Sequence, residues 1–543
     1  MFTPLRQSGG RNHTPRRGPA VRWKPAVELL EDRQLLTAPF TVGGDPIVNP
    51  SDFRITVFAS GLNYPHGLAS LVDGSLLVGI NNPKGGGTSF YNTTGQLVRF
   101  VDTNDDGVAD GPGTVLFDGL PGQITSIQQA GNHLIAVSSQ PGVEQISVLR
   151  QGATPADALT YVGGVRLQFP SGWMHTIYTS AVRPTPGSPG DYDLLFNIGS
   201  QFNGVVIGSD GKVVLDENGN PTYQPTTGTV SATGLFNATL MGDSIYLVTL
   251  RNADPNAGGG DPPVFSGPIR VASGLRNAAS LAFHPITGDL YFAENGIDGN
   301  SFGNESWSTD ELNRLRGRQI GGRVENFGYP YSYHRTVEKP GDPVTVVRPR
   351  LGRQPLVSFQ PLPDPTTEKG VESEGASGFA ISPRFFPPGL NRGVFVGFHG
   401  KFNTGGLANE ENPVVFVDPR TGHYFHFIST REPNVGHIDN ILSTADSLYL
   451  ADLSTTGDLF GAGGPGNGAI YQIKAVASLP AASAPPRSSL IRRTSLSPPS
   501  QPRHFAQSQM LFPPGPWSSP TEAIDAGPAT FTQSKTKNQR RSR

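Results

Sequence analysis

The sequence predicts an all-β fold of the β-propeller class, and three observations support this prediction. Glycine (68 residues) and proline (50 residues) are abundant in the 543-residue chain, whereas charged residues make up only 16%. This balance favours many short strands joined by turns over long helices. Apolar residues alternate with polar ones in short runs, without the amphipathic helices that a βαβ fold requires. A strand-turn-strand pattern also recurs roughly every 40 to 60 residues, the spacing of propeller blades.

The repeat begins with Gly-Leu or a similar lead-in, followed by a short apolar strand, a turn with Asp or Gly, and a second apolar strand. It occurs in segments 61–79, 119–137, 178–198, 235–250, 275–292, 379–398 and 438–450. Propeller blades surround a central channel and present the ends of their inner strands at its mouth. A site at that mouth would therefore be assembled from residues far apart in the sequence.

Composition divides the chain into three zones. Residues 1–50 are a basic arm and a short leader, residues 51–476 carry the strand pattern, and residues 477–543 are a basic tail rich in Ser and Pro. Outside the leader, both ends hold too few apolar residues to bury a core, so we expect disordered N- and C-terminal segments. The basic ends suit contact with a cell surface, and a solvated tail is the plainer alternative.

Several function classes are excluded by what the chain lacks. It has no cysteine, which rules out disulfides, thiolate catalysis and cysteine-ligated zinc. A net charge of −2 provides no field that would attract nucleic acid. No apolar run approaches the roughly 20 residues of a membrane span. Phosphate-binding glycine loops, a GxSxG elbow and a His-Glu-x-x-His motif are absent as well.

The most informative stretch lies between residues 274 and 297. Residues 281–283 and 290–292 predict two short strands with a turn at 285–289. Arg276 and Asn277 come just before this hairpin, and Glu294 and Asn295 come just after it. The hairpin would bring these polar residues to the same edge.

The order of the sequence blocks resembles the glucose/sorbosone dehydrogenase family, β-propellers that hold pyrroloquinoline quinone (PQQ) and calcium and oxidise sugars. The resemblance covers about residues 52–475 and implies six blades, with the pair at 235–250 as an inserted hairpin. The blocks that carry it are His175, Ile198-Gly199-Ser200-Gln201, Gly274-Leu275-Arg276-Asn277, Asp310-Glu311-Leu312-Asn313 and Asn326-Phe327-Gly328-Tyr329-Pro330-Tyr331. The leader at 27–37 resembles one found in exported proteins of planctomycete-type bacteria, and a small amphipathic helix is its alternative interpretation.

The resemblance implies that His175 is the general base. Oxidation of a sugar hydroxyl requires removal of a proton from oxygen while hydride leaves carbon, and imidazole titrates near neutrality. Arg276 and Asn277 would contact the quinone, since a guanidinium forms paired charge-assisted bonds with carboxylates. The structural alternatives are a partly buried histidine at a strand end and an arginine that bridges blades through backbone carbonyls.

The resemblance also places calcium at the turn of Asn295, Gly296 and Ile297, whose backbone carbonyls are the hard oxygen donors that this ion prefers. Ile297 stands where the family has proline.

Three residues late in the chain occupy positions at which the family contacts its cofactor. Lys401 is expected to neutralise a PQQ carboxylate, and His399 to face the channel. His437 is the nearest substitute for the arginine pair with which glucose dehydrogenases grip the quinone. The missing arginines are the largest departure from the family pattern.

A second calcium pattern lies at residues 102–110. Asp102, Asn104, Asp106 and Asp110 follow the spacing of EF-hand and dockerin-type loops, although position 12 is glycine. A weak structural calcium site is one interpretation, and an Asp-rich turn is the other.

Together these features predict an exported quinoprotein, periplasmic, cell-surface or extracellular, that oxidises an aldose or related polyol. Its partners would be a small sugar substrate and an unidentified electron acceptor. One alternative is a propeller without PQQ that binds carbohydrate or a surface. The other is a calcium-dependent, lactonase-type hydrolase, to which Glu294, Asn295 and Asp439 would contribute ligands.

Overall fold

The computed structural model describes residues 38–225, 227–251, 263–299, 306–364, 367–371, 375–400, 414–430 and 437–476. The leader, the tail, most of the basic arm and Lys401 lie outside the described residues. The described chain is all-β, with short 3-10 turns at Pro50–Asp52, Lys84–Gly86 and Gly317–Gln319 and no α-helix among the described residues. None of these described helices is long and apolar enough to cross a membrane.

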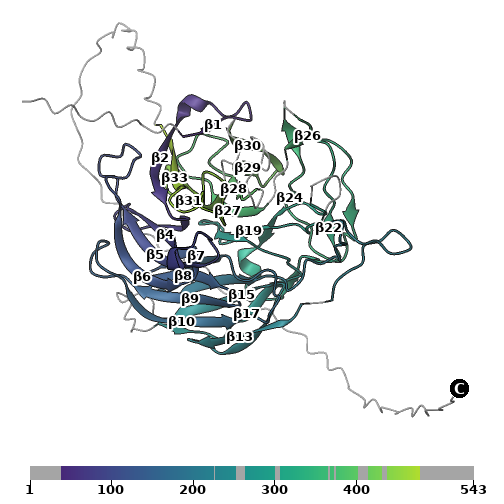
Figure 1. Cartoon of the computed structure of the whole chain (residues 1–543), viewed down its shortest axis with the longest axis horizontal. Helices are drawn as coiled ribbons and strands as arrows, with labels where there is room; N and C mark the ends of the chain where they lie inside the picture. The colour runs from purple at the N-terminus through teal and green to yellow at the C-terminus, as the bar shows by residue number, and fades with distance from the viewer. Residues whose placement is uncertain are drawn as a thin grey trace, which may run out of the picture. The chain divides into compact units, whose positions relative to one another are not determined.

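Six sheets form the six blades of a propeller, which confirms the predicted fold class (Figure 1). The first blade contains β3 (His66–Ser70), β4 (Leu76–Pro83), β5 (Thr93–Phe100) and β6 (Thr114–Pro121). The second contains β7 (Gln123–Ala130), β8 (His133–Gln140), β9 (Val143–Arg150), β10 (Thr160–Gln168), β13 (Thr229–Gly234) and β14 (Ala238–Met241). The third contains β11 (Ser180–Pro184), β12 (Tyr192–Ile198), β15 (Ser244–Arg251), β16 (Val264–Phe265), β17 (Ile269–Ser273) and β21 (Glu325–Asn326).

The remaining blades follow in chain order. The fourth contains β18 (Ser280–Phe283), β19 (Leu290–Glu294), β20 (Glu311–Leu315) and β24 (Val357–Ser358). The fifth contains β27 (Ala376–Ile381), β28 (Val394–Phe398), β29 (Val414–Asp418), β30 (His423–Thr430) and β1 (Phe40–Val42). The sixth contains β31 (Ile438–Ser443), β32 (Ser447–Asp452), β33 (Gly468–Ala475) and β2 (Phe53–Leu62). Two short pairs lie outside the blades: β22 (Tyr333–His334) with β23 (Val346–Val347), and β25 (Leu362–Asp364) with β26 (Thr367–Val371).

The ring is closed by strands from opposite ends of the described chain. β2 pairs antiparallel with β33, from Phe53 opposite Ala475 to Leu62 opposite Gly468, so the sixth blade is completed by an N-terminal strand. β1, which lies within the segment 1–50, pairs with β30 at the outer edge of the fifth blade. The inner strands β3, β7, β11, β18, β27 and β31 each contact the next one around the ring.

Each pair of neighbouring blades shares an apolar cluster, and strand periodicity explains how one strand serves two clusters. In β28, Val394, Val396 and Phe398 pack against the fourth blade, whereas Phe395 packs against the sixth. Successive side chains of a strand point to opposite faces, so a strand buried on both faces is apolar throughout. Strands buried on both faces, such as β28, are therefore apolar throughout and depart from the predicted alternation.

The pair at 235–250 is divided between two blades. β14 extends the second blade, whereas β15 is the third strand of the third blade. The inserted hairpin is instead β13 with β14, which joins the free edge of the second blade at β10. The sequence repeat therefore occurs seven times in a six-bladed propeller, because segment 235–250 contains strands of two different blades.

Candidate active site

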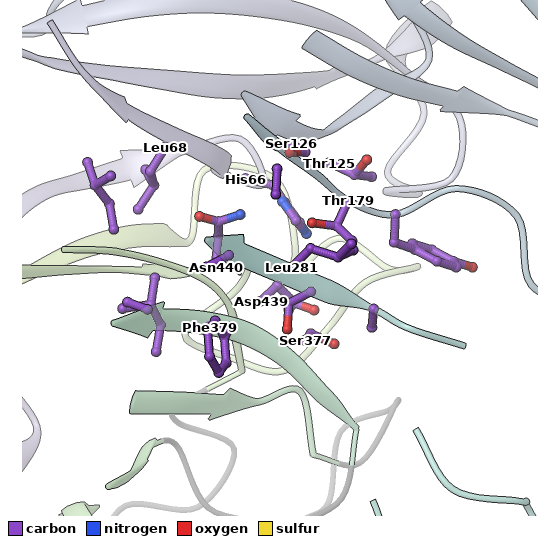
Figure 2. Close-up of a pocket in the computed structure, with 18 of the residues that line it drawn as sticks. His66, Leu68, Thr125, Ser126, Thr179, Leu281, Ser377, Phe379, Asp439 and Asn440 are labelled. Carbon is purple, nitrogen blue, oxygen red and sulfur yellow. The ribbon is translucent and has the colours of Figure 1, made fainter. Parts of the chain in front are cut away.

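A cavity of about 1290 Å³ follows the propeller axis and is lined by the inner strands of all six blades. Figure 2 shows polar side chains that line this cavity, among them His66, Thr125, Thr179 and Asp439. Each inner strand also contributes apolar side chains, including Leu68, Ile127, Ala181, Leu281, Phe379 and Ile441. Such a cavity, mainly apolar with a few placed polar groups, is typical of ligand sites.

Backbone irregularities place several of the polar side chains. The pairing register shifts by one residue near the start of β3, β7, β27 and β31. The extra residues are Gly67, Thr125, Ser377 and Asp439, and the last three line the cavity. A β-bulge bends the strand and changes the direction of a side chain. The same irregularity in four blades thus presents three polar groups to one cavity.

His175 lines the cavity with a defined hydrogen-bond arrangement. Its Nδ1 lies 3.0 Å from the hydroxyl of Ser200, and that hydroxyl donates to the carbonyl of Phe202 at 2.6 Å. Since the single hydroxyl proton goes to Phe202, the Ser200 oxygen accepts from Nδ1–H. The other ring nitrogen, Nε2, is therefore left unprotonated as an acceptor. This tautomer is the one that a general base needs.

Electrostatics keep this imidazole neutral. Burial, and then the positive charge of Arg276, lower the pKa of His175 well below its ordinary value of 6.5. The backbone also fixes the residue, because its amide donates to the carbonyl of Ser200 at 3.0 Å. A side chain at Gly199 would meet the His175 Cβ at 2.6 Å, so the turn after β12 requires glycine at this position.

We expect Ser200→Ala to release the tautomer of His175 without unfolding the protein. The variant loses the acceptor of Nδ1–H, so the proton is free to exchange between the two ring nitrogens. In ¹⁵N-histidine NMR spectra the wild type should show the Nδ1–H form of His175, and Ser200→Ala should show a mixture of both forms. Unchanged nitrogen shifts would contradict the role of Ser200 in orienting this ring.

The hairpin of β18 and β19 brings its polar flanks together, as the sequence predicts. The amide of Arg276 donates to the Glu294 carboxylate at 2.7 Å, and the Asn277 side-chain amide donates to Asn295 Oδ1 at 2.7 Å. The amide of Asn295 in turn donates to the carbonyl of Asn277 at 3.0 Å. Arg276, Asn277 and Asn295 all line the cavity, whereas Glu294 lies buried behind them.

The guanidinium of Arg276 already has partners within the chain. It donates to Asn203 Oδ1 through Nε at 3.2 Å and through one terminal nitrogen at 2.9 Å, and it forms an ion pair with Asp298. The Arg276 side chain is only 4% exposed, whereas that of Asp298 is 54% exposed. The positive charge is thus held at the cavity wall and partly balanced there.

Asp310 joins the fourth and fifth blades at the predicted calcium turn. Its two carboxylate oxygens accept the amides of Gly296 at 2.7 Å and Ala376 at 2.6 Å. Burial raises the pKa of Asp310 to about 6, although these two bonds favour the charged form. A side chain at Gly296 would meet the Ser308 carbonyl oxygen at 2.0 Å, so the turn requires glycine.

The three residues of that turn have different surroundings. Asn295 and Gly296 line the cavity. Ile297 does not: its side chain packs in a buried apolar cluster with Trp307, and its carbonyl accepts the amides of Trp307 and Ser308 at 2.9 and 3.3 Å. Within the described part of the chain, the buried Asn277 Oδ1 has no hydrogen-bond partner. The oxygen atoms that calcium could use as ligands at this turn are therefore those of Asn277, Asn295 and Gly296 rather than the carbonyl of Ile297.

A histidine–aspartate cluster forms the opposite wall. His399 lines the cavity, and its Nδ1 lies 2.9 and 2.8 Å from the two oxygens of Asp439. Burial lowers the pKa of His399, but Asp439 outweighs it and leaves that pKa raised; burial raises the pKa of Asp439, but His399, His66 and His437 leave it lowered. Each member of the pair therefore favours the charged form of the other. His66 lies beside it, and its buried Nδ1 has no hydrogen-bond partner among the residues that the structure describes.

His437 does not line the cavity. Its Nδ1 contacts the carbonyl of His399, and burial, together with the charge of His399, lowers its pKa to about 4. At neutral pH His437 is uncharged, so it does not supply the positive charge of the arginine pair that the resemblance leads one to expect there.

The calcium pattern at 102–110 is separate from the cavity. Asp102 accepts the amides of Asp106 and Gly107, and Asp110 accepts the amide and hydroxyl of Thr103. These carboxylates, like Asn104, are engaged in closing their own turn. Among the described residues no group of three or more His, Cys, Asp or Glu side chains is placed to hold a metal ion. Calcium binding at this loop stays a prediction.

Sequence reasoning missed some of the residues that form this site. Ser200 and Asp310 lie in blocks that carry the resemblance, so their positions were available from the sequence. Thr125 and Ser377 had no such signal, because they reach the cavity only through bulges in the backbone. Asn203, the partner of Arg276, lies 73 residues away in the chain.

Comparisons with known proteins give limited information. No family model matches the chain. An uncharacterized protein of Borreliella burgdorferi is 24% identical over 151 residues, which amount to 28% of this chain and 35% of that protein. The chain thus matches about a third of the length of this relative.

Several solved structures are similar in chain trace. The holo form of the PQQ domain of pyranose dehydrogenase from Coprinopsis cinerea aligns with 80% of this chain and 97% of its own at 15% identity and a TM-score of 0.43. PQQ-bound aldose sugar dehydrogenase from Streptomyces coelicolor aligns with 79% and 99% at 17% identity and a TM-score of 0.43. A putative oxidoreductase (glucose dehydrogenase) from Thermus thermophilus aligns with 78% and 99% at 15% identity and a TM-score of 0.42. These TM-scores are below 0.5, so the fold and site rest on the topology and geometry described above.

Proposed function

We propose that the protein is an exported sugar dehydrogenase that uses PQQ and calcium to oxidise an aldose or a related polyol. The observation that carries this proposal is the hydrogen-bond chain from Phe202 through Ser200 to His175. It leaves a neutral imidazole with an accepting nitrogen on the wall of a large axial cavity. The sequence blocks that resemble glucose/sorbosone dehydrogenases support the same interpretation, including export and delivery of electrons to a separate acceptor.

The residues around the cavity fit these groups. Asn277 Oδ1 is a buried oxygen that has no hydrogen-bond partner among the described residues, and a calcium ion would satisfy it together with oxygens of Asn295 and Gly296. Arg276 and Asn277 would hold PQQ through charge-assisted and amide hydrogen bonds. Lys401, outside the described residues, is proposed to contribute a further positive charge. The volume of about 1290 Å³ suits a flat cofactor together with a sugar.

Each residue then has a defined part in the reaction. When bound, PQQ supplies the two-electron acceptor for hydride from the sugar carbon. His175 Nε2 removes the proton of the adjacent hydroxyl, so the alcohol carbon becomes a carbonyl. Ser200 holds the ring through Nδ1–H, and the resulting imidazolium keeps this bond. The apolar side chains that line the cavity, among them Leu281 and Phe379, limit the water that reaches it.

A second candidate is a propeller that binds carbohydrate without oxidising it. The observation that favours it is the state of the cations: Arg276 is already paired with Asp298, and His437 is neutral and lies outside the cavity. Within the part of the chain that the structure describes, neither residue supplies an unbalanced charge for the carboxylates of PQQ. Sugar hydroxyls need no such charge.

Calorimetric titration of PQQ into the calcium-loaded protein decides between the two. Under the dehydrogenase proposal the wild type binds PQQ, and Asn277→Ala binds it at least about tenfold more weakly because a cofactor contact and a calcium ligand are lost. Asn220→Ala, in an exposed turn, is the matched control and should bind as the wild type does. Absence of PQQ binding at saturating calcium would reject the dehydrogenase, and sugar binding by the cofactor-free protein would then support the second candidate.

A further inference from the structure

A second cavity of about 400 Å³ lies beside the third blade, and none of the residues that line it lines the axial cavity. It is enclosed by the segment that follows β12, the turn between β14 and β15, β17, and the loop that follows β21. Ser200 lines this second cavity, while its hydroxyl binds His175 on the axial side. The two cavities are therefore neighbours that share one wall.

One carboxylate oxygen in the second cavity has no partner among the described residues. Asp243 Oδ1 is buried with no hydrogen bond among the described residues. Burial raises the pKa of Asp243 to about 7, opposed by a hydrogen bond from Thr227 and by the charge of Arg270. A buried acceptor without a donor costs free energy, about 1 to 3 kcal/mol in proteins generally. A ligand with a hydroxyl hydrogen would remove this cost.

The backbone of Asp243 is also unusual. Its φ is +54°, in the left-handed region that residues other than glycine seldom adopt. Its amide donates to the Gly199 carbonyl and its own carbonyl accepts the Leu275 amide, both at 3.4 Å. The residue is thus fixed between the two segments that carry Ser200 and Arg276. Strained residues held in this manner cluster at binding and catalytic sites.

Donors and an apolar surface complete the lining. Arg270 lines the cavity; its Nε donates to Ser244 and one terminal nitrogen to Met241 Sδ, and among the described residues it forms no ion pair. Tyr329 and Tyr331 line another part together with Phe202 and Pro330. An acceptor, a cationic donor and aromatic surface therefore meet in one small cavity.

We propose that the second cavity binds a neutral polyhydroxylated molecule of monosaccharide size. A hydroxyl both donates and accepts, so neighbouring hydroxyls can donate to Asp243 and accept from Arg270. A simple cation is opposed by Arg270, and a simple anion by Asp243. The carbon face of a sugar ring suits the surface formed by Tyr329 and Tyr331, and the volume is at the lower end of the range of ligand sites.

This site is distinct from the proposed oxidation site but connected with it. The amide of Ser200 donates to the carbonyl of Arg276 at 2.7 Å, and Asp243 contacts both flanking segments. A ligand in the second cavity would thus contact the wall that positions His175. The inference does not depend on PQQ or calcium, because none of its residues belongs to the proposed cofactor site.

The methionines provide one probe for each cavity. Met241 lines the second cavity and Met174 the axial one, and the other methionines of the chain, Met1 and Met510, lie outside the described residues. We would label the methionine methyl groups of the full-length, cofactor-free protein with ¹³C and titrate it with D-glucose up to about 100 mM, enough to saturate a site with a Kd of about 1 mM. Met241→Leu and Met174→Leu assign the two signals.

The expected result is a saturable shift of the Met241 signal. The apparent Kd should be at least about tenfold weaker in Asp243→Asn, which replaces one carboxylate oxygen with a donor, and in Tyr331→Leu, which removes aromatic surface. Asn220→Ala, in an exposed turn that lines neither cavity, should leave the shift of Met241 unchanged. The signal of Met174, which lies in the propeller, reports whether each variant stays folded.

Three outcomes would overturn the proposal. In the first, Met241 does not respond to D-glucose. In the second, it responds equally in Asp243→Asn and the wild type. In the third, it responds more strongly to glycine, a zwitterion that would pair with Asp243 and Arg270 by charge. A response of Met174 alone would overturn this proposal while leaving the dehydrogenase proposal standing.

Discussion

His175→Gln should lower turnover with an aldose by about 10²- to 10⁴-fold, the usual contribution of a general base. Glutamine keeps a polar side chain of similar length but has no basic nitrogen. KM should change little, because His175 acts on the hydroxyl proton rather than on the body of the sugar. The measurement is dye-coupled oxidation of D-glucose by the PQQ- and calcium-loaded protein, with the variant and the wild type at equal loading.

The matched control is His423→Gln. His423 lies on the outer strand β30, its side chain is 57% exposed, and it does not line the cavity. This variant should oxidise D-glucose at the wild-type rate. Equal turnover in the two histidine variants would show that His175 is not the base, even if PQQ binds.

The pH dependence of the wild type tests the same group. Because burial and Arg276 hold the pKa of His175 well below 6.5, the imidazole stays neutral and able to accept a proton as pH falls from 8 to 6.5. kcat/KM should therefore be flat across this window and decline only at lower pH, where His175 becomes protonated. An acidic limb centred above pH 6.5 would contradict the assignment.

Asp310→Ala should destabilise the protein by about 3 kcal/mol at pH 5. The substitution leaves the buried amides of Gly296 and Ala376 without their acceptors, and each unsatisfied buried donor costs about 1 to 3 kcal/mol. The link between the fourth and fifth blades at the Asn295 turn would be lost as well. Urea-induced unfolding followed by circular dichroism measures the difference in the free energy of unfolding.

The effect should depend on pH with a defined sign. The pKa of Asp310 is about 6 in the folded protein and about 3.8 when unfolded, so the folded state binds the proton more tightly. The resulting stability is fully present below pH 3.8 and is lost as pH rises through 6. The wild type should therefore lose this contribution between pH 4 and pH 7, whereas Asp310→Ala should not, and the difference between them should shrink at higher pH.

Asp216→Ala is the control for this prediction. Asp216 also accepts two backbone amides, those of Asn218 and Asn220, but it lies in an exposed turn where water can replace it. Its removal should change the unfolding curve much less. A loss as large as that of Asp310→Ala would mean that burial is not the reason for the importance of Asp310.

The strands and the composition of the site could be predicted from local features of the chain. Such features are the alternation of apolar and polar residues and the positions of glycine and proline. They predicted the hairpin of β18 and β19, which brings Arg276 to Glu294, because all of these residues lie less than 20 positions apart. The propeller class also followed from repeats at blade spacing, whereas the number of six blades came from the resemblance to the glucose/sorbosone dehydrogenase family, because the repeat itself occurs seven times. Six residues identified from sequence blocks line the cavity: His175, Arg276, Asn277, Asn295, Gly296 and His399.

The pairing, charge and orientation of these residues depend on contacts between distant segments. The assignment of β14 and β15 to different blades, the closure of β2 on β33, and the pairing of Arg276 with Asp298 are set by which segments meet in space. The neutral state of His437 depends on burial, which a sequence pattern does not specify. Local periodicity determines which face of a strand each side chain occupies. The hydrogen-bond partners, the solvent exposure and the electrostatic environment of each side chain are determined only when the blades close into a ring.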